Sequence, residues 1–245
     1  MKKRALLIAN TNILNGTKKD IIDFMNFLRS YTGGAWNLSE IFKPLYNPSK
    51  QGLLSIIETI KREKNDYVIV LFSGHGGHKR ELLIEINETE EKINESDLKG
   101  IAKRQLTIFD CCRNILQENL REDSIFSKSQ EDFSDIKNII REKFDERIMQ
   151  AAAQQVTLFS CSVGQSSYDT NNGAVYLSNF IKAAKNVSGE FKTVGLAHQE
   201  SIEPTYQYSL SMNDGVQRPD ASLPKCLTEQ QLIISINPSK YVSYS

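Results

Sequence analysis

The chain has few cysteines, no excess of either charge and no long hydrophobic run. Its 245 residues include four cysteines, and 30 basic residues balance 30 acidic ones. Four cysteines are too sparse for a disulfide scaffold in a chain of this size, so we expect a reducing, cytoplasmic environment. The balanced charge gives no field that would attract nucleic acid or an anionic membrane surface. A membrane-spanning helix needs about 20 apolar residues in succession, and the sequence has no such run.

The amino-terminal residues resemble a signal peptide only superficially. The basic residues 2–4 precede an apolar run at residues 5–9, which is too short for a signal sequence and is not followed by a small-residue cleavage site. We expect this run to be the first buried strand. The sequence contains no internal repeat and no low-complexity segment, and we expect one domain over residues 1–245, long enough to bury a core.

Short β-branched runs alternate with segments whose apolar residues recur at helical spacing. Such runs are typical of strands buried on both faces, and the alternation predicts an α/β fold with a mainly parallel sheet. The predicted strands are Arg4–Ala9, Glu40–Tyr46, Tyr67–Phe72, Leu82–Ile86, Gln105–Phe109, Gln155–Cys161, Tyr206–Met212 and Gln231–Ile236. The predicted helices are Asp20–Tyr31, Gln51–Lys64, Ser96–Lys103, Asp135–Gln150 and Gly173–Lys185, with a flexible polar linker at about residues 114–135.

Two of the predicted strands end in reactive side chains. The strand at 67–72 leads into Ser-Gly-His75-Gly-Gly, and the strand at 105–109 leads into Asp-Cys-Cys112-Arg. Reactive groups gather at the carboxyl ends of the strands in an open parallel sheet. A thiol needs a base to become a thiolate, and an imidazole from another strand can supply one. Side chains alternate along a strand, so only one of the two cysteines can meet His75. The pattern predicts a cysteine–histidine hydrolase.

These motifs resemble those of the caspase-like cysteine peptidases (caspases, metacaspases and paracaspases), most closely the short prokaryotic members. The resemblance extends from about Arg4 to Pro204 and rests on three motifs in the family's order: Phe-Ser-Gly-His-Gly at 72–76, Asp-Cys-Cys-Arg at 110–113, and Ser-Cys at 160–161 followed by Gln-Ser-Ser-Tyr-Asp at 165–169. It implies a three-layer caspase-haemoglobinase-like fold, with helices on both faces of a mainly parallel central sheet. It also implies a cysteine endopeptidase of a bacterial defence, stress or cell-death pathway.

The resemblance assigns catalytic roles to individual residues. Cys112 matches the family's nucleophile, because the family writes Asp-x-Cys at this strand end, and His75 matches its general base. Cys111 then becomes a wall residue. The backbone N–H groups of Gly76 and Cys112 match the family's oxyanion hole, where donors meet the charge that develops on the substrate oxygen. No third catalytic side chain is identifiable, and the family often orients its histidine with a backbone carbonyl.

The resemblance also bears on specificity. Caspases hold an acidic substrate side chain with two arginines, and the matching positions here are Leu14 and Asp169, so both positive charges are missing. Asp110 and Asp20 match acidic positions of the metacaspase pocket, and Ser73 matches a pocket-lining position. Three carboxylates around a cavity favour a cation and repel an anion. The hypothesis is cleavage after Arg or Lys.

The resemblance further implies regulation and partners. The family's linker after the nucleophile is often cut during activation, which suggests a zymogen that cleaves itself near Arg121 or Lys128. The chain departs from the family at Lys19-Asp20, where Asn-Asp is usual, and at Arg113-Asn114, where no family glycine is evident. We expect a protein or peptide substrate as the partner, with an activating protein partner as a second candidate, and neither nucleic acid nor membrane.

Other interpretations of the same residues are weaker. His75-x-x-His78 with two cysteines suggests zinc, but adjacent cysteines do not readily turn to one metal. The glutamate-rich stretch Asn87–Glu95 lacks the alternating spacing of a calcium loop. We therefore expect no metal and no cofactor. We place His78 at the surface and His198 in a loop.

Two alternatives for function and one for the carboxylates stay open. Asp110 and Asp169 have a structural alternative as caps or turn residues. The chain as a whole has an alternative as a non-catalytic caspase-like interaction module that binds a partner without cutting it. An acyl-transferring or non-peptide hydrolase that uses the same Cys–His pair is the third possibility.

Overall fold

The central sheet has six strands in the order β10-β8-β7-β3-β1-β2. The computed structural model describes residues 1–12, 14, 16–115, 135–213 and 215–241. Five strands are parallel, and β10 pairs antiparallel with β8 at one edge. The strands are β1 (Lys3–Ala9), β2 (Leu45–Tyr46), β3 (Tyr67–Ser73), β7 (Arg104–Asp110), β8 (Gln154–Phe159) and β10 (Asp220–Ser222).

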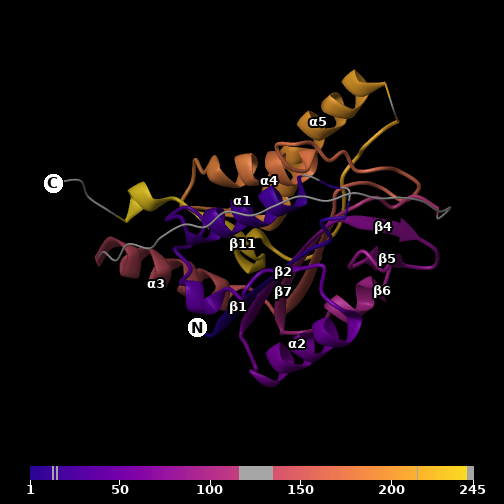
Figure 1. Cartoon of the computed structure of the whole chain (residues 1–245). Helices are drawn as coiled ribbons and strands as arrows, with labels where there is room; N and C mark the ends of the chain where they lie inside the picture. Colours follow the sequence, from indigo (N-terminus) through magenta and orange to yellow (C-terminus); the bar gives the residue numbers. More distant parts are fainter. Residues whose placement is uncertain (13, 15, 116–134, 214, 242–245) are drawn as a thin grey trace.

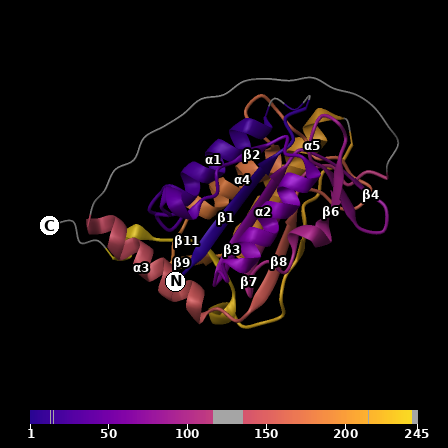
Figure 2. The same cartoon turned by 60° about the horizontal axis from the view of Figure 1, so that its bottom comes forward.

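Helices cover both faces of this sheet (Figure 1). One face packs against α1 (Thr17–Arg29), α3 (Asp135–Gln150) and α4 (Val175–Lys185). The opposite face packs against α2 (Lys50–Arg62), which Figure 2 shows lying along the strands. That face also carries an antiparallel sheet of β4 (His75–His78), β5 (Leu82–Glu85) and β6 (Lys92–Asn94). The remaining elements are β9 (Phe191–Thr193), α5 (Val194–Met212), β11 (Ile233–Ile236) and short 3-10 turns at Leu38–Glu40, Glu95–Leu98, Thr228–Gln230 and Pro238–Lys240.

The period of two along each strand explains the two cores. In β1, Leu7 packs with the α1 and α4 side, while Leu6 and Ile8 pack with the α2 side. A parallel strand covered on both faces needs apolar residues at successive positions, which is why these strands are nearly continuous apolar runs. The predicted α/β fold, with a mainly parallel sheet between helices on both faces, is confirmed. Among the described residues, none of the helices is both long and apolar enough to cross a membrane.

The predicted strand Tyr206–Met212 is wrong, because this segment is the last part of α5. The buried residues of α5 include three small polar ones, Ser201, Thr205 and Ser209. Their hydroxyls bond to backbone carbonyls of the preceding turn, as Thr205 does to Ser201 at 2.7 Å. A helix that buries hydroxyls in this way lacks the apolar 3.6-residue period by which helices are recognised.

Two smaller expectations are also wrong. The predicted helix Ser96–Lys103 is reduced to the 3-10 turn at Glu95–Leu98. His198 lies on α5 rather than in a loop, and its Nδ1 is 2.8 Å from the Tyr176 hydroxyl. Burial lowers the pKa of His198 to about 4, so this histidine is neutral inside the core.

Leu71→Ala tests the central position of β3. Leu71 is fully buried between β1 and β7, and truncation leaves a cavity that should lower the free energy of unfolding by about 2–5 kcal/mol. Urea unfolding measures the loss. The control is Leu210→Ala, at an exposed position on α5, where a change below about 0.5 kcal/mol is expected. Equal losses in the two variants would contradict this placement of the core.

Candidate active site

The register between β3 and β7 brings the two sequence motifs together. Ser73 pairs with Asp110 across the sheet, at the carboxyl ends of both strands. The Gly74 N–H donates to the Asp110 carbonyl at 3.0 Å, which continues the pairing one step further. His75 and Cys112 each follow two residues beyond this matched pair, and their side chains line one pocket.

The pocket contains ≈ 310 Å³ of empty space, part of it open to solvent. Its walls come from the ends of β3 and β7, the start of α1 and the segment between β8 and α4. The lining residues are Leu14, Thr17, Ser73, Gly74, His75, Asp110, Cys111, Cys112, Ser167, Tyr168, Asp169 and Ala174.

The Cys112 thiol is half-buried and contacts the backbone of Ser167. Its Sγ accepts the Ser167 N–H at 3.3 Å and lies 3.7 Å from the Ser167 carbonyl oxygen. Burial raises the pKa of Cys112, and the Ser167 N–H opposes that shift. Cys111 is more deeply buried, and burial raises its pKa well above the usual range. Both thiols are therefore protonated near neutral pH, so that a nucleophilic role needs a base.

His75 is oriented by a backbone carbonyl. Its Nε2 lies 2.6 Å from the Asn12 carbonyl oxygen. A carbonyl only accepts hydrogen bonds, so Nε2 carries the hydrogen and Nδ1 remains free to take a proton. The Asn12 N–H donates to the side chain of Asn10, whose own amide donates to the Glu85 carbonyl in β5. Fully buried Asn10 thus holds the segment that orients the histidine.

Gly76 lies directly against the cysteine pair. A Cβ at this position would come within 2.7 Å of both the Cys111 sulfur and the Cys112 carbonyl oxygen. Only glycine permits this approach of β4 to the residues that follow β7. The structure therefore places Gly76 beside Cys112, and its oxyanion role stays a prediction.

Asp110 and Asp169 line the pocket and also satisfy helix amino termini. Asp110 accepts the Leu177 N–H in the first turn of α4 at 3.0 Å and the Ser167 hydroxyl at 2.8 Å. Asp169 accepts the Gly16 N–H at the start of α1, also at 3.0 Å. Free N–H groups and the helix dipole favour a carboxylate at such positions. The capping role considered from the sequence is therefore present in both residues, alongside their place in the pocket lining.

Asp20 lies behind the pocket wall rather than in it. It is 2% exposed, and its two oxygens accept the Ser73 hydroxyl at 2.7 Å and the Ala174 N–H at 2.8 Å. Ser73 and Ala174 both line the pocket. Asp20 consequently supports two lining residues through hydrogen bonds.

Burial dominates the protonation of these three carboxyl groups. It raises the pKa of Asp110 to about 6, against the opposing effect of its hydrogen bonds. Burial, with the charge of Asp110 added, raises the pKa of Asp20 well above its usual range. Burial also raises the pKa of Asp169. A cation that entered the pocket would restore the charge of these groups and be bound by it.

The remaining predictions concern metal binding and the linker. Among the described residues, no group of three or more His, Cys, Asp or Glu side chains is arranged to hold a metal. The linker sites Arg121 and Lys128 lie outside the described residues. The sequence did not identify three further residues of the site: Asn10, Asn12 and Ser167. Asn12 and Ser167 contact His75 and Cys112 through backbone groups, and Asn10 accepts the Asn12 N–H in a local turn.

Comparison with known proteins identifies the family of the chain. The family model of the caspase domain matches residues 2–219. The chain therefore belongs to the caspase domain family and is a caspase-like cysteine peptidase. Its fold is similar to the crystal structure of caspase-1 from Spodoptera frugiperda, with a TM-score of 0.58 and 12% identity over 90% of this chain and 86% of that one. No curated protein sequence matches the chain.

Asp110→Asn tests the buried carboxyl through the pH dependence of stability. The pKa of Asp110 is raised in the fold, so its contribution to stability is complete below about pH 4 and is lost as the pH rises through about 6. A shift of about 2 pH units corresponds to about 3 kcal/mol. Urea unfolding between pH 4 and 7.5 should therefore show a shallower fall in unfolding free energy for Asp110→Asn than for the wild type.

The control is Asp23→Asn, at a residue of the α1 surface that pairs with Lys19. It should keep the wild-type slope between pH 4 and 7.5. Parallel pH profiles for wild type and Asp110→Asn would show that Asp110 is charged throughout this range.

Proposed function

We propose that the chain is a cysteine endopeptidase that cleaves protein substrates after Arg or Lys. One observation carries the proposal: His75 and Cys112 line a pocket that is also lined by the acidic residues Asp110 and Asp169. Neither Arg nor Lys is among the described residues that line it. A nucleophile and a base beside an acidic cavity suit hydrolysis next to a cationic side chain.

The proposed reaction uses His75 as the base and Cys112 as the nucleophile. His75 Nδ1 takes the thiol proton as Cys112 Sγ attacks the substrate carbonyl carbon, and the N–H groups of Gly76 and Cys112 stabilise the oxyanion. The C–N bond then breaks, and His75 returns the proton to the leaving amine. Water, deprotonated by the same imidazole, hydrolyses the thioester and regenerates the thiol.

The acidic pocket supports the choice of a cationic substrate side chain. An arginine guanidinium offers five donors and could bond to carboxylate oxygens that are held at helix amino termini. An aspartate in the same pocket would face Asp110 and Asp169. Repulsion at short range in a partly desolvated pocket disfavours it strongly.

The resemblance to short prokaryotic members supports the wider setting of the proposal. We place the enzyme in the cytoplasm, in a bacterial defence, stress or cell-death pathway, where an activating partner or self-cleavage within residues 114–135 would release its activity. This setting rests on analogy with the family. The substrate protein itself is not specified by the residues of the pocket.

The alternative is a non-catalytic caspase-like module that binds a partner peptide in the same pocket. The burial that raises the pKa of Cys112 is the observation that favours it, because a thiol without a working base stays protonated. The rate of Cys112 alkylation against pH separates the two. A module predicts the profile of an ordinary buried thiol, and a peptidase predicts faster labelling that depends on His75.

Two fluorogenic peptides that differ only in the residue before the scissile bond test the proposal. The wild type should cleave the Arg peptide at least 100-fold faster than the Asp peptide, because only the cation is attracted to the carboxylates. Cys112→Ala should lose at least 1,000-fold of this activity, while Cys226→Ala, which removes a cysteine outside the pocket, should retain it. Initial rates by fluorescence provide the measurement.

Each other outcome has a distinct meaning. Preference for the Asp peptide would refute the acidic pocket as the specificity site. Cleavage that survives Cys112→Ala and vanishes in Cys111→Ala would transfer the nucleophile to the neighbouring thiol. Absence of cleavage of both peptides would direct the test to a sample activated by a partner or by proteolysis before the alternative is accepted.

A further inference from the structure

The side chain of Gln217 is fully buried beside the pocket, although it belongs to none of the three motifs. Its Oε1 accepts the Tyr168 N–H at 3.0 Å. Its Nε2 donates to the Ser160 carbonyl at 2.9 Å and to the Ser167 hydroxyl oxygen at 3.1 Å. The partners fix which end of the amide is which, since a carbonyl only accepts and an N–H only donates. Both amide hydrogens and the amide oxygen are therefore used.

Two of these partners belong to the segment that holds the nucleophile. Ser167 donates its backbone N–H to Cys112 Sγ, and its hydroxyl donates to Asp110. Gln217 bonds to that same hydroxyl oxygen and to the next N–H along the chain. Ser167 therefore connects Gln217 to the Cys112 thiol and to the Asp110 carboxyl group.

The polarity of this hydrogen-bond chain matters for Asp110. Because the Ser167 oxygen accepts from the Gln217 amide, its single hydrogen is directed to Asp110. A carboxylate in place of the amide would accept that hydrogen instead and would also face the Ser160 carbonyl oxygen. Replacement of the Gln217 amide by an isosteric carboxylate would therefore reverse the direction of these hydrogen bonds without a change in side-chain volume.

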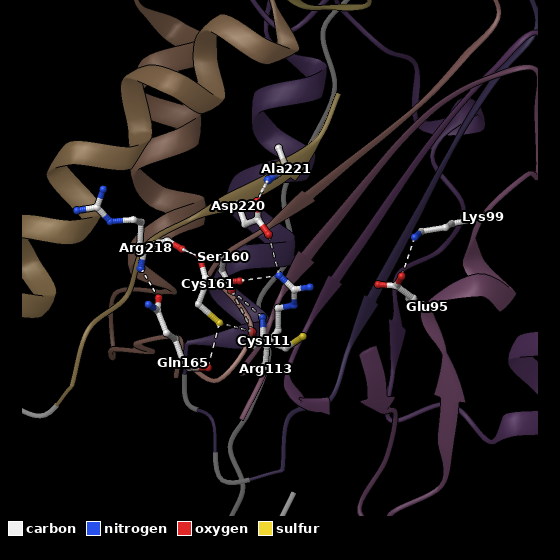
Figure 3. Close-up of polar contacts among 11 residues, drawn as sticks. Glu95, Lys99, Cys111, Arg113, Ser160, Cys161, Gln165, Arg218, Asp220 and Ala221 are labelled. Atoms are coloured by element: carbon white, nitrogen blue, oxygen red, sulfur yellow. Dashed lines mark hydrogen bonds and ion pairs between the residues drawn. The ribbon is translucent and has the colours of Figure 1, made fainter. Parts of the chain in front are cut away.

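Residues next to Gln217 also connect segment 215–218 to residues 160–168. The Arg218 N–H donates to the Gln165 side chain at 2.8 Å, and Figure 3 shows Arg218 beside Gln165, close to Cys161 and Ser160. The Ser162 hydroxyl donates to the Arg218 carbonyl, and the Tyr168 hydroxyl donates to the Gly215 carbonyl. Segment 215–218 therefore lies along residues 160–168 over its described length.

We propose that Gln217 is a positioning residue, which holds Ser167 so that its N–H meets the Cys112 thiol and its hydroxyl meets Asp110. The inference rests on the proposed peptidase function for its consequence in catalysis. Its effect on the thiol exists whether or not the chain cleaves peptides. A peptidase with a displaced Ser167 would lose reactivity at the nucleophile and affinity in the pocket together.

The pH dependence of Cys112 alkylation tests the proposal. Iodoacetamide labelling of the full chain is followed between pH 6 and 10, with fragment-ion mass spectrometry to separate Cys112 from the adjacent Cys111. The variants are Gln217→Glu, which keeps the volume, and Gln217→Ala, which removes the amide. The matched control is Gln207→Ala, because Gln207 is exposed on α5 and bonds only to Glu203 in the described structure.

In both Gln217 variants the midpoint of Cys112 labelling should move at least half a pH unit higher, because the thiolate loses the Ser167 N–H. In Gln207→Ala it should stay at the wild-type value. Circular dichroism and urea unfolding identify a variant that does not fold, and Gln217→Glu then decides the matter alone. A folded Gln217→Glu with a wild-type midpoint would overturn the proposal.

Peptide cleavage provides the second readout. If the wild type cleaves the Arg peptide, Gln217→Glu should lower kcat/KM at least 10-fold with a rise in KM, since Asp110 is also disturbed. If the wild type cleaves no peptide even after activation by a partner or by proteolysis, while the labelling midpoint still moves, the positioning role holds and the proposed peptidase function fails. A moved midpoint with unchanged kcat/KM in an active enzyme would refute the catalytic consequence.

Discussion

The site depends on one alignment, the pairing of β3 with β7 in parallel register. Ser73 lies opposite Asp110, and the two reactive side chains follow at equal distances beyond this pair. Side chains alternate along a strand, so a slip of one residue would turn either His75 or Cys112 to the opposite face. The long apolar runs of both strands, packed between helices on two faces, set the register and thereby the chemistry.

Three carboxyl groups occupy positions where two requirements oppose each other. The amino termini of α1 and α4 need acceptors for unpaired N–H groups, which Asp169, Asp110 and, next to the first turn of α4, Asp20 supply. Burial at the same time raises the pKa of all three. The capping and the pocket interpretations of these residues are therefore compatible. A pocket built in this way has its acidic groups positioned in advance but not fully charged.

Sequence could predict the sheet, the Cys–His pair and the acidic residues, because each carries a local pattern at the end of a strand. His75 and Cys112 lie at the pocket, as expected, while their roles and those of Asp20, Asp110, Asp169 and Ser73 remain predictions. Sequence could not predict contacts that join distant segments through ordinary polar residues. Gln217 is 50 residues from Ser167, and no local feature distinguishes it from a surface glutamine. The α5 helix was missed for a related reason, since half of its buried residues carry hydroxyl groups in place of apolar side chains.

Segment 215–218 comes late in the chain, after every catalytic motif. During synthesis, β1, β3 and β7 are complete long before Gln217 leaves the ribosome, and domains fold as their segments emerge. The nascent chain therefore carries the histidine and the thiol for an interval without the side chain that clamps Ser167. The order of translation delays completion of the pocket wall, and a chain released early by a stop codon before residue 217 would contain both reactive residues in an unclamped site.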